Sequence, residues 1–347
     1  MDVRLSLPVF SAIGFYLLWV LMLQNGTLDA LDAVTSTGVF PTGRPLSTTY
    51  LGIPPIDGAI STLVAFTDAL TNGAEGSPRL LMIEVVSTLQ SASLWVIIES
   101  LRRGSGSLGL VLASFWPLMW NGFGAGVVLP LYYFFEAGKL PPKRNKNDHV
   151  SVAHAKALLP TALITLFLPV LVDLAPPLVS REPRPHNIIT ALFQATGLYA
   201  AVVQPLIASQ LSGSATPRAT TEKAVRRAYF YAGIFSSIGH IYAVSTSLLS
   251  EDPAVSFSRT FVPAMSDVVP GTSRTVFEGT LLFLKYDNLI ITITSALWQW
   301  LSLKPYLNVK SRIDYVSTAF LITLSTLVLG PGGSVSFAHY LRESWIR

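Results

Sequence analysis

Long apolar runs are the feature that most constrains this chain. A window of about 19 residues, the length of a helix that crosses a bilayer, finds nine of them among the 347 residues. They lie at 7–24, 55–71, 80–98, 108–135, 157–175, 188–209, 228–249, 279–303 and 313–330. We therefore predict an all-α protein, a polytopic transmembrane helical bundle of about nine spans, or eight if the first run is a cleaved signal peptide.

The scarcity of charge agrees with this prediction. Charged side chains make up 13% of the chain, about half of the roughly 25% that is usual in soluble domains. This composition excludes a soluble enzyme, a disordered regulator and a collagen-like chain. The chain has no cysteine, which excludes a disulfide-stapled domain, thiol catalysis and cysteine-ligated metals.

The basic residues indicate how the bundle is oriented. With nine spans, all seven lysines in loops fall on the N-terminal side, which we assign to the cytoplasm. The net charge of +4 is then explained by the basic residues on the cytoplasmic side of the bundle, and nucleic acid is not an expected partner. We expect one integral-membrane domain, 1–347, in the endoplasmic reticulum, with lumenal loops at 25–54 and 250–277 and a cytoplasmic loop at 136–156. The oligomeric state is left open.

The fourth apolar run contains several residues that interrupt a helix. These are Pro117, Gly122, Gly124, Gly126 and Pro130. In a membrane such a segment is kinked or re-entrant, and its freed backbone groups face protein or water.

Carboxylates near the spans are the candidate functional groups, because ionisable residues are costly inside a membrane. Under the nine-span topology Asp57, Glu99 and Glu278 lie at the lumenal boundary. Asp287 is deeper, about 13 Å along the helix from Glu278. Structural roles compete with function: Asp57 and Glu278 suit the first turn of a helix, and Glu99 is at ion-pair spacing from Arg102.

Two further observations bear on the site. Asp287 could join Lys285 in a structural network, but nothing at a helix end requires an acid at its position. Trp116 and Trp120 share one helix face and could present their rings to a cation. The five histidines include no HExxH pattern and no pair at i, i+4, so we expect neither a metal site nor a cofactor.

Three motifs together resemble the longer branch of the fungal integral-membrane terpene cyclases of meroterpenoid and indole-diterpene pathways. They are Pro54-Pro55-Ile56-Asp57, Glu99-Ser100-Leu101-Arg102 and Pro130-Leu131-Tyr132-Tyr133. The similarity is concentrated in residues 50–135. The sequence also lacks the DDxxD and DxDD strings of soluble terpene cyclases.

The resemblance implies acid-initiated, metal-independent cyclisation of a prenyl chain, often epoxidised, on an aromatic or indole core. A buried carboxylic acid would protonate the epoxide, and aromatic faces would stabilise the carbocation until a proton is lost or a hydroxyl captures it. The implied catalytic residues are Asp57, Glu99, Asp287, Arg102 and Glu278, with Trp116, Trp120 and Tyr132 around the substrate. If Arg102 pairs tightly with Glu99, the role of the acid moves to Asp57 or Asp287.

Two other classes of function remain open on the sequence alone. The broken fourth run and the intramembrane Asp287 and Lys285 are also compatible with a multi-pass transporter of small molecules. A non-enzymatic membrane scaffold would use the same carboxylates as salt bridges. In each case the expected partners are the lipid bilayer and, for the enzyme, a hydrophobic prenylated small molecule.

Overall fold

The computed structural model describes residues 2–72, 76–102, 106–139, 150–174, 182–211, 218–307 and 311–345. This part of the chain is helical, which confirms the predicted all-α class. Its one extended pairing is an isolated bridge between Val39 and Pro45. The helices are α1 (Ser6–Phe15), α2 (Leu21–Gln24), α3 (Thr27–Thr37), α4 (Pro54–Thr71), α5 (Gly76–Arg102), α6 (Gly106–Phe123), α7 (Ala125–Ala137), α8 (Val152–Ala162), α9 (Leu168–Leu174), α10 (Pro183–Phe193), α11 (Thr196–Gln210), α12 (Arg218–Leu249), α13 (Phe257–Phe261), α14 (Thr275–Leu303) and α15 (Arg312–Trp345).

Six helical segments of the described chain are long and apolar enough to cross a membrane. They are Val3–Gln24, Gly76–Arg102, Val152–Leu174, Thr220–Leu249, Thr275–Tyr306 and Arg312–Trp345. The pair α10 and α11, bent by 58°, makes a seventh if it counts as one span. The first and third segments are continuous because π-helical turns join α1 to α2 (Tyr16–Val20) and α8 to α9 (Leu163–Phe167).

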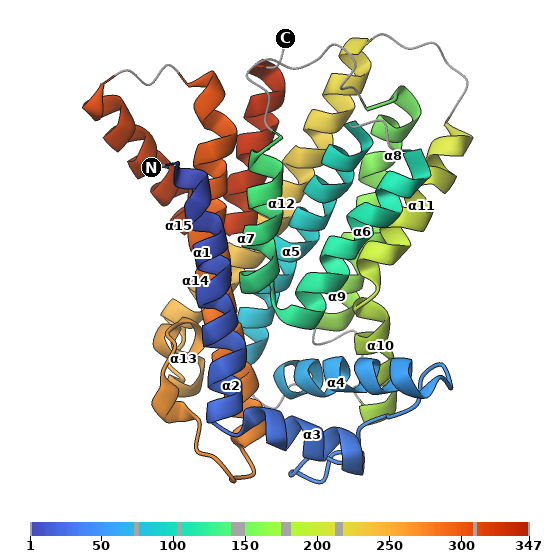
Figure 1. Cartoon of the computed structure of the whole chain (residues 1–347), viewed down its shortest axis with the longest axis vertical. Helices are drawn as coiled ribbons and strands as arrows, with labels where there is room; N and C mark the ends of the chain where they lie inside the picture. The colour runs from blue at the N-terminus through green and yellow to red at the C-terminus, as the bar shows by residue number, and fades with distance from the viewer. Residues whose placement is uncertain are drawn as a thin grey trace.

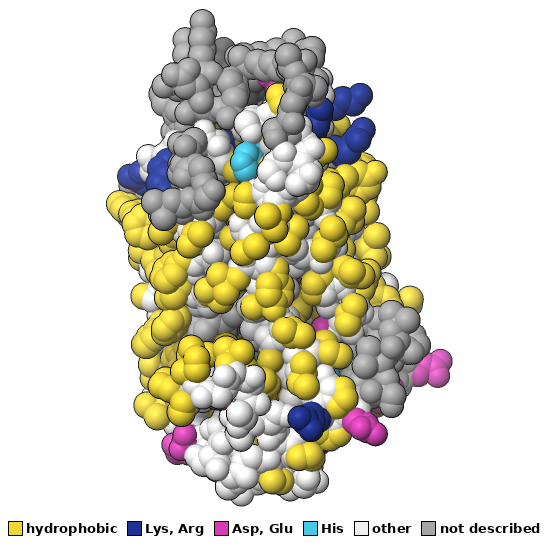
Figure 2. Space-filling model, turned by 90° about the vertical axis from the view of Figure 1, so that its right-hand side faces the viewer, with side chains coloured by type: hydrophobic (Ala, Val, Ile, Leu, Met, Phe, Trp, Pro, Cys, Tyr) yellow, Lys and Arg dark blue, Asp and Glu magenta, His cyan; other side chains and the backbone are white. Residues whose placement is uncertain are grey.

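The segments form an upright bundle with two distinct ends (Figure 1). We call the end that carries both termini the upper end, and the opposite end, with α3, α4 and α13, the lower end. Figure 2 shows that hydrophobic side chains cover the middle of one face and that most charged side chains lie toward its two ends. Such a belt is typical of a surface that faces lipid.

The span count differs from the nine that the sequence predicts. The run 55–71 forms α4, which lies across the lower end and is not among the candidate spans (Figure 1). Its buried Asp68 accepts hydrogen bonds from Arg44 and Asn187 and lies 3.3 Å from His186. These polar partners hold α4 at the end of the bundle, where its two carboxylates need not enter an apolar layer.

The run 108–135 is the predicted re-entrant segment, and it folds as two antiparallel helices. α6 descends from the upper end and α7 returns to it (Figure 1). The turn is at Gly124, whose φ of 87° is one that residues with a side chain rarely adopt. We call α6 and α7 together the α6–α7 hairpin.

α15 is a second hairpin that the sequence analysis does not predict. Gly330, with φ 73° and ψ 164°, divides it into a descending and an ascending limb. Pro331 has no N–H group to donate to the carbonyl of Leu327, and His240 Nε2 lies 2.9 Å from that oxygen instead. The C-terminus therefore returns to the upper end, whereas nine spans would place it at the opposite end.

The predicted loops are partly structured. The segment 25–54 contains α3 and the segment 250–277 contains α13, and both helices lie at the lower end (Figure 1). Of the predicted loop 136–156, residues 140–149 lie outside the described residues.

A close contact between glycines positions the hairpin against the N-terminal helix. A Cβ atom on Gly14 of α1 would lie 2.5 Å from the carbonyl oxygen of Gly126 in α7. Backbone cannot move away as a flexible side chain does, so this contact requires glycine on α1.

We expect Gly14→Ala to lower the free energy of unfolding by about 1–3 kcal/mol, because the added methyl group overpacks the contact. The measurement is the thermal unfolding midpoint of the protein in detergent. Gly58→Ala on α4 is the matched control, since a Cβ atom there meets nothing within 4 Å. Equal midpoints for the two variants would contradict the account of this contact.

Candidate active site

A cavity of about 300 Å³ lies toward the lower end of the bundle, where the tip of the α6–α7 hairpin meets α3, α4, α5, α10 and α14. Its lining is mostly apolar and aromatic. The lining residues are Trp19, Met22, Leu28, Leu31, Asp32, Thr35, Thr62, Leu63, Phe66, Thr67, Met82, Val85, Val86, Leu89, Trp120, Asn121, Gly122, Gly124, Phe193, Gln194, Phe283, Leu284 and Asp287.

Asp287 is the buried carboxyl group of this cavity. It lies on α14, and its Oδ1 accepts a hydrogen bond of 2.6 Å from the N–H group of Gly126. Within the described chain it forms no ion pair. An apolar wall without a neighbouring cation favours the neutral form of a carboxylic acid, which is the form that donates a proton.

The tip of the α6–α7 hairpin is shaped to receive Asp287. The first turn of α7 has no side-chain cap of its own, and the carboxyl group of Asp287 meets the backbone there. A Cβ atom on Gly124 would lie 2.8 Å from Leu18 and 3.2 Å from Asp287 Oδ1, and one on Gly126 would lie 3.1 Å from the same oxygen. Glycine at both positions therefore lets the backbone approach the acid.

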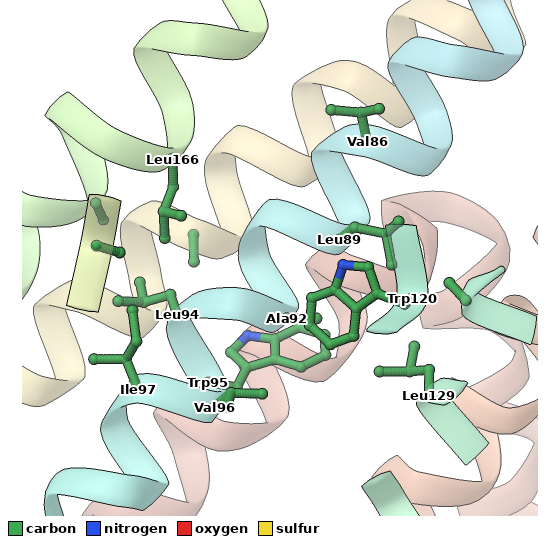
Figure 3. Packing of buried hydrophobic residues seen from close by; sticks show 14 of the residues in the cluster. Val86, Leu89, Ala92, Leu94, Trp95, Val96, Ile97, Trp120, Leu129 and Leu166 are labelled. Carbon is green, nitrogen blue, oxygen red and sulfur yellow. The ribbon is translucent and has the colours of Figure 1, made fainter. Parts of the chain in front are cut away.

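Aromatic rings surround the space next to Asp287. Phe283, one turn before Asp287 on α14, packs edge-to-face against Phe66 of α4 and Trp19, with centroids 5.0 and 6.0 Å away. Trp120 of α6 adds a fourth ring to the lining. Figure 3 shows it among the apolar residues of α5, which include Leu89, Ala92 and Trp95. Such ring faces can stabilise a cation without reacting with it.

Polar groups occupy another part of the lining. Asn121 Nδ2 donates to the carbonyl oxygen of Gln194, and Gln194 Nε2 donates to Thr67 Oγ1. Asp32 on α3 is exposed, so the cavity has a second carboxylate beside the buried one. The sequence analysis did not select any of these residues.

Asp57 is not in the cavity and has a structural role. Two prolines start α4, and the carboxylate in its first turn accepts hydrogen bonds from the N–H groups of Leu51, Tyr50 and Gly52, at 2.7–3.0 Å. The N–H group of Leu51, together with the other two, lowers the pKa of Asp57 below its ordinary value. This is the opposite of what a proton donor at neutral pH requires, so the assignment of Asp57 as the acid is not supported by its geometry.

Glu99 lies at the upper end, so the prediction that it lies on the same side of the membrane as Asp57 is wrong. The run 55–71 does not cross the bundle, and α5 therefore ends at the upper end. The kink in α15 brings Arg342 and Glu343 to the end of α5, where Arg342 is 2.5 Å from Glu99 and Arg102 is 2.5 Å from Glu343. Arg102 is also 3.6 Å from Glu99. These four residues form the upper ion cluster. A carboxylate held by two guanidinium groups is stabilised as the anion, so Glu99 is a poor acid.

Glu278 and Lys285 belong to a third polar group, at the lower end. Glu278 pairs with Arg259 at 2.8 Å and with Arg274 at 2.7 Å, while Lys285 is 3.5 Å from Asp267. Lys285 therefore pairs with an acid from another segment, as the structural alternative expected, but Asp287 is not part of this group. The two residues are two positions apart on α14 and face different neighbours.

The three predicted aromatic residues separate in the same way. Trp120 lines the cavity with Asp287, whereas Trp116 and Tyr132 line a different cavity of about 220 Å³ near Glu99. Their rings pack edge-to-face against each other, with centroids 5.4 Å apart. The structure therefore places the predicted site residues in two cavities: Asp287 and Trp120 line the first, whereas Glu99, Trp116 and Tyr132 line the second.

Comparison with known proteins gives a consistent result. The chain matches the family model described as the CtvD domain over residues 3–347. It is 33% identical over 359 residues to terpene cyclase DEP1 of Alternaria brassicicola, with 97% of each chain covered. It is 30% identical over 364 residues to terpene cyclase DEP1 of Fusarium langsethiae, with 99% of each covered, and 26% identical to terpene cyclase alnG of Emericella nidulans, with 96% of this chain and 91% of the relative covered. No solved structure matches the chain significantly.

A family model that covers almost the whole chain and relatives of this identity establish the family. The resemblance inferred from the three motifs is confirmed. The chain belongs to the CtvD-domain family of fungal terpene cyclases and is an enzyme of the terpene cyclase type.

Proposed function

We propose that this enzyme cyclises a prenyl chain with an epoxide at its end, carried by a meroterpenoid or indole-diterpene precursor, and that Asp287 is the acid that starts the reaction. One observation carries the proposal. Asp287 is the predicted carboxyl group that lines an apolar, aromatic cavity without an ion-pair partner in the described chain, whereas Asp57, Glu99 and Glu278 are held by backbone or arginine donors.

The first step needs a neutral carboxylic acid. The proton of Asp287 passes to the epoxide oxygen as one C–O bond breaks, and the electrons of that bond stay on the oxygen, which becomes a hydroxyl group. The electron pair of the next double bond then attacks the carbon that has lost the oxygen, which closes a ring and moves the positive charge along the chain. The hydrogen bond from Gly126 keeps the carboxyl group oriented toward the cavity and stabilises the carboxylate that remains.

The later steps depend on the lining. Trp19, Phe66, Phe283 and Trp120 place π-electrons around the migrating cation, and the apolar side chains exclude water that would quench it. Loss of a proton to a carboxylate, or capture by a hydroxyl group of the substrate, ends the sequence. Asp287, now ionised, and Asp32 at the polar part of the cavity are the two carboxylates that can accept that proton.

The proposal includes a location in the membrane, and in particular in the endoplasmic reticulum with the N-terminus in the cytoplasm. The apolar belt supports a bilayer location (Figure 2), and a prenyl substrate would enter from the lipid. The upper end carries Lys139, Lys223 and Lys304. Compared with the nine-span topology it gains Arg102 and Arg342 and loses Arg79, which lies at the start of α5, so it gains one basic residue among these three. Basic residues are retained on the cytoplasmic side, so this gain supports the orientation. The names of the relatives favour the enzyme over a transporter or a scaffold.

We expect Asp287→Asn to lower the rate of cyclisation at least about 100-fold, the smallest effect usual for loss of a general acid. Asparagine has nearly the same volume and still offers an oxygen to Gly126, but it has no acidic proton. The measurement is product formation by microsomes from a heterologous host supplied with epoxyprenyl aromatic substrates. Asp29→Asn removes an exposed carboxylate from α3 and should leave the rate unchanged. A fully active Asp287→Asn enzyme would exclude Asp287 as the acid.

We expect Phe283→Leu to change the distribution of products while the protein still folds. Loss of one ring removes about 0.5–2 kcal/mol of cation stabilisation, so we expect a slower reaction and a larger share of products with fewer rings or with added water. Product analysis by mass spectrometry tests this. Phe257→Leu on α13, which lies outside the cavity lining, serves as the control. An unchanged product distribution in Phe283→Leu would argue against a role for this ring.

Asp57→Asn should affect stability in a pH-dependent way and leave the chemistry intact. Because the folded state lowers the pKa of Asp57, its stabilising effect is present above the ordinary value of 3.8 and is lost as the pH falls through the lower folded value. The variant should therefore unfold at a lower temperature than wild type at pH 7, and the two midpoints should converge below pH 4. A difference between the midpoints that does not depend on pH would contradict this role.

A further inference from the structure

A third cavity, an open hollow of about 560 Å³, lies at the upper end between the start of α12 and the end of α15. Three basic side chains, Lys223, Arg226 and Arg227, line it from α12, and Tyr340 lines it from α15. It is far from the active-site cavity along the bundle, and none of its residues lines that cavity. The proposed reaction uses none of them.

The charge of the hollow is positive. Two acids also line it, Glu222 and Glu343, but Glu343 is already paired with Arg102 in the upper ion cluster. Among the lining residues that the structure describes, three cations therefore face one further acid, Glu222. An anion with more than one oxygen acceptor is the ligand that such a set of donors recognises.

Arg226 is held in place for such a ligand. Its guanidinium carbon lies 4.4 Å from the centre of the Tyr340 ring, a stacking contact that fixes the plane of the guanidinium group. Its buried Nε has no hydrogen-bond partner within the described part of the chain. A stacked guanidinium group keeps its N–H edge available, and that edge matches the geometry of a phosphate.

The surface below the hollow is apolar. Phe230, Tyr231, Ile234, Ile238 and Ile241 follow one another on α12 at helical spacing, and each is more than a third exposed. This apolar stripe begins at the basic hollow and continues toward the middle of the bundle. A ligand with a phosphate at one end and a long hydrocarbon chain at the other would contact both parts.

We propose that this hollow is a binding site for an anionic phospholipid, with the phosphate between Lys223, Arg226 and Arg227 and an acyl chain along the exposed stripe of α12. The proposal rests on the membrane location given above. The lipid site is independent of the chemistry at Asp287. Lipid binding can therefore be absent from an enzyme that cyclises its substrate, and lipid binding can be retained in an enzyme that does not.

The test is native mass spectrometry of the full-length protein in detergent with dioleoyl phosphatidic acid. Dioleoyl phosphatidylcholine is the zwitterionic control, and inorganic phosphate is the headgroup alone. The variants are Arg226→Gln/Arg227→Gln and, because Arg226 contacts Tyr340, a second pair restricted to exposed residues, Lys223→Gln/Arg227→Gln. Lys304→Gln/Arg312→Gln removes two exposed charges from the same end outside the hollow.

We expect wild type and the Lys304/Arg312 control to retain phosphatidic acid in preference to phosphatidylcholine. Both hollow variants should lose about 30-fold in affinity for it, the effect of two basic groups near an anionic headgroup, while cyclisation in detergent stays unchanged. Equal retention of the two lipids, or unchanged affinity in both hollow variants, would overturn the site. Displacement of the lipid by millimolar inorganic phosphate would overturn the lipid assignment in favour of a soluble phosphate.

Discussion

The contact between Asp287 and the backbone of Gly126 is the interaction on which the active site depends. It joins α14, a candidate span of the bundle, to the tip of a hairpin that enters the bundle and turns back. The hairpin can present its backbone there because Gly124 takes a conformation with positive φ and Gly126 leaves room for the carboxyl group. The same contact satisfies a backbone donor at the start of α7 and fixes the acid at the wall of the cavity.

The carboxylates of this protein fall into two groups, according to whether arginine side chains or several backbone N–H groups stabilise their negative charge. Asp57, Asp68, Glu99 and Glu278 each have backbone N–H groups or arginine side chains as partners, and the pair of Glu99 with Arg342 connects segments that are distant in sequence. Groups of this kind are stable as anions and contribute to the fold. Asp287 accepts a hydrogen bond from the backbone at the start of α7, has no arginine or lysine partner in the described chain, and otherwise lies among mostly apolar and aromatic side chains. That difference in surroundings, rather than depth alone, is what makes it suitable to hold and release a proton.

The sequence predicts the class of fold and one essential local feature, but not how the segments meet. The helical class follows from the length of the apolar runs, and the break in 108–135 follows from its glycines and prolines. The predicted side of the C-terminus was wrong, because Gly330-Pro331 lies in an apolar stretch and its effect on chain direction is not visible in a hydropathy window. Glu99 was placed at the wrong end for a different reason: the run 55–71 forms α4 across the lower end instead of crossing, so α5 runs from the lower end to the upper end. Asp287 and Trp120 were selected from the sequence and line the cavity, whereas Trp19, Phe66, Phe283 and Gln194 were not selected, because they come from separate segments that only the tertiary fold brings together.

The central claim is that Asp287 is the carboxyl group that meets the epoxide, and covalent labelling tests it most directly. A short isoprenoid epoxide that cannot cyclise would be opened by the acid that binds it, so that a carboxyl oxygen bonds to the epoxide carbon and the proton passes to the epoxide oxygen. Peptide mapping of the labelled protein then identifies the ester. We predict the label on Asp287, with labelling prevented by an excess of substrate. A substrate-protected label on Asp57, Glu99 or Glu278, with Asp287 unmodified, would contradict the account.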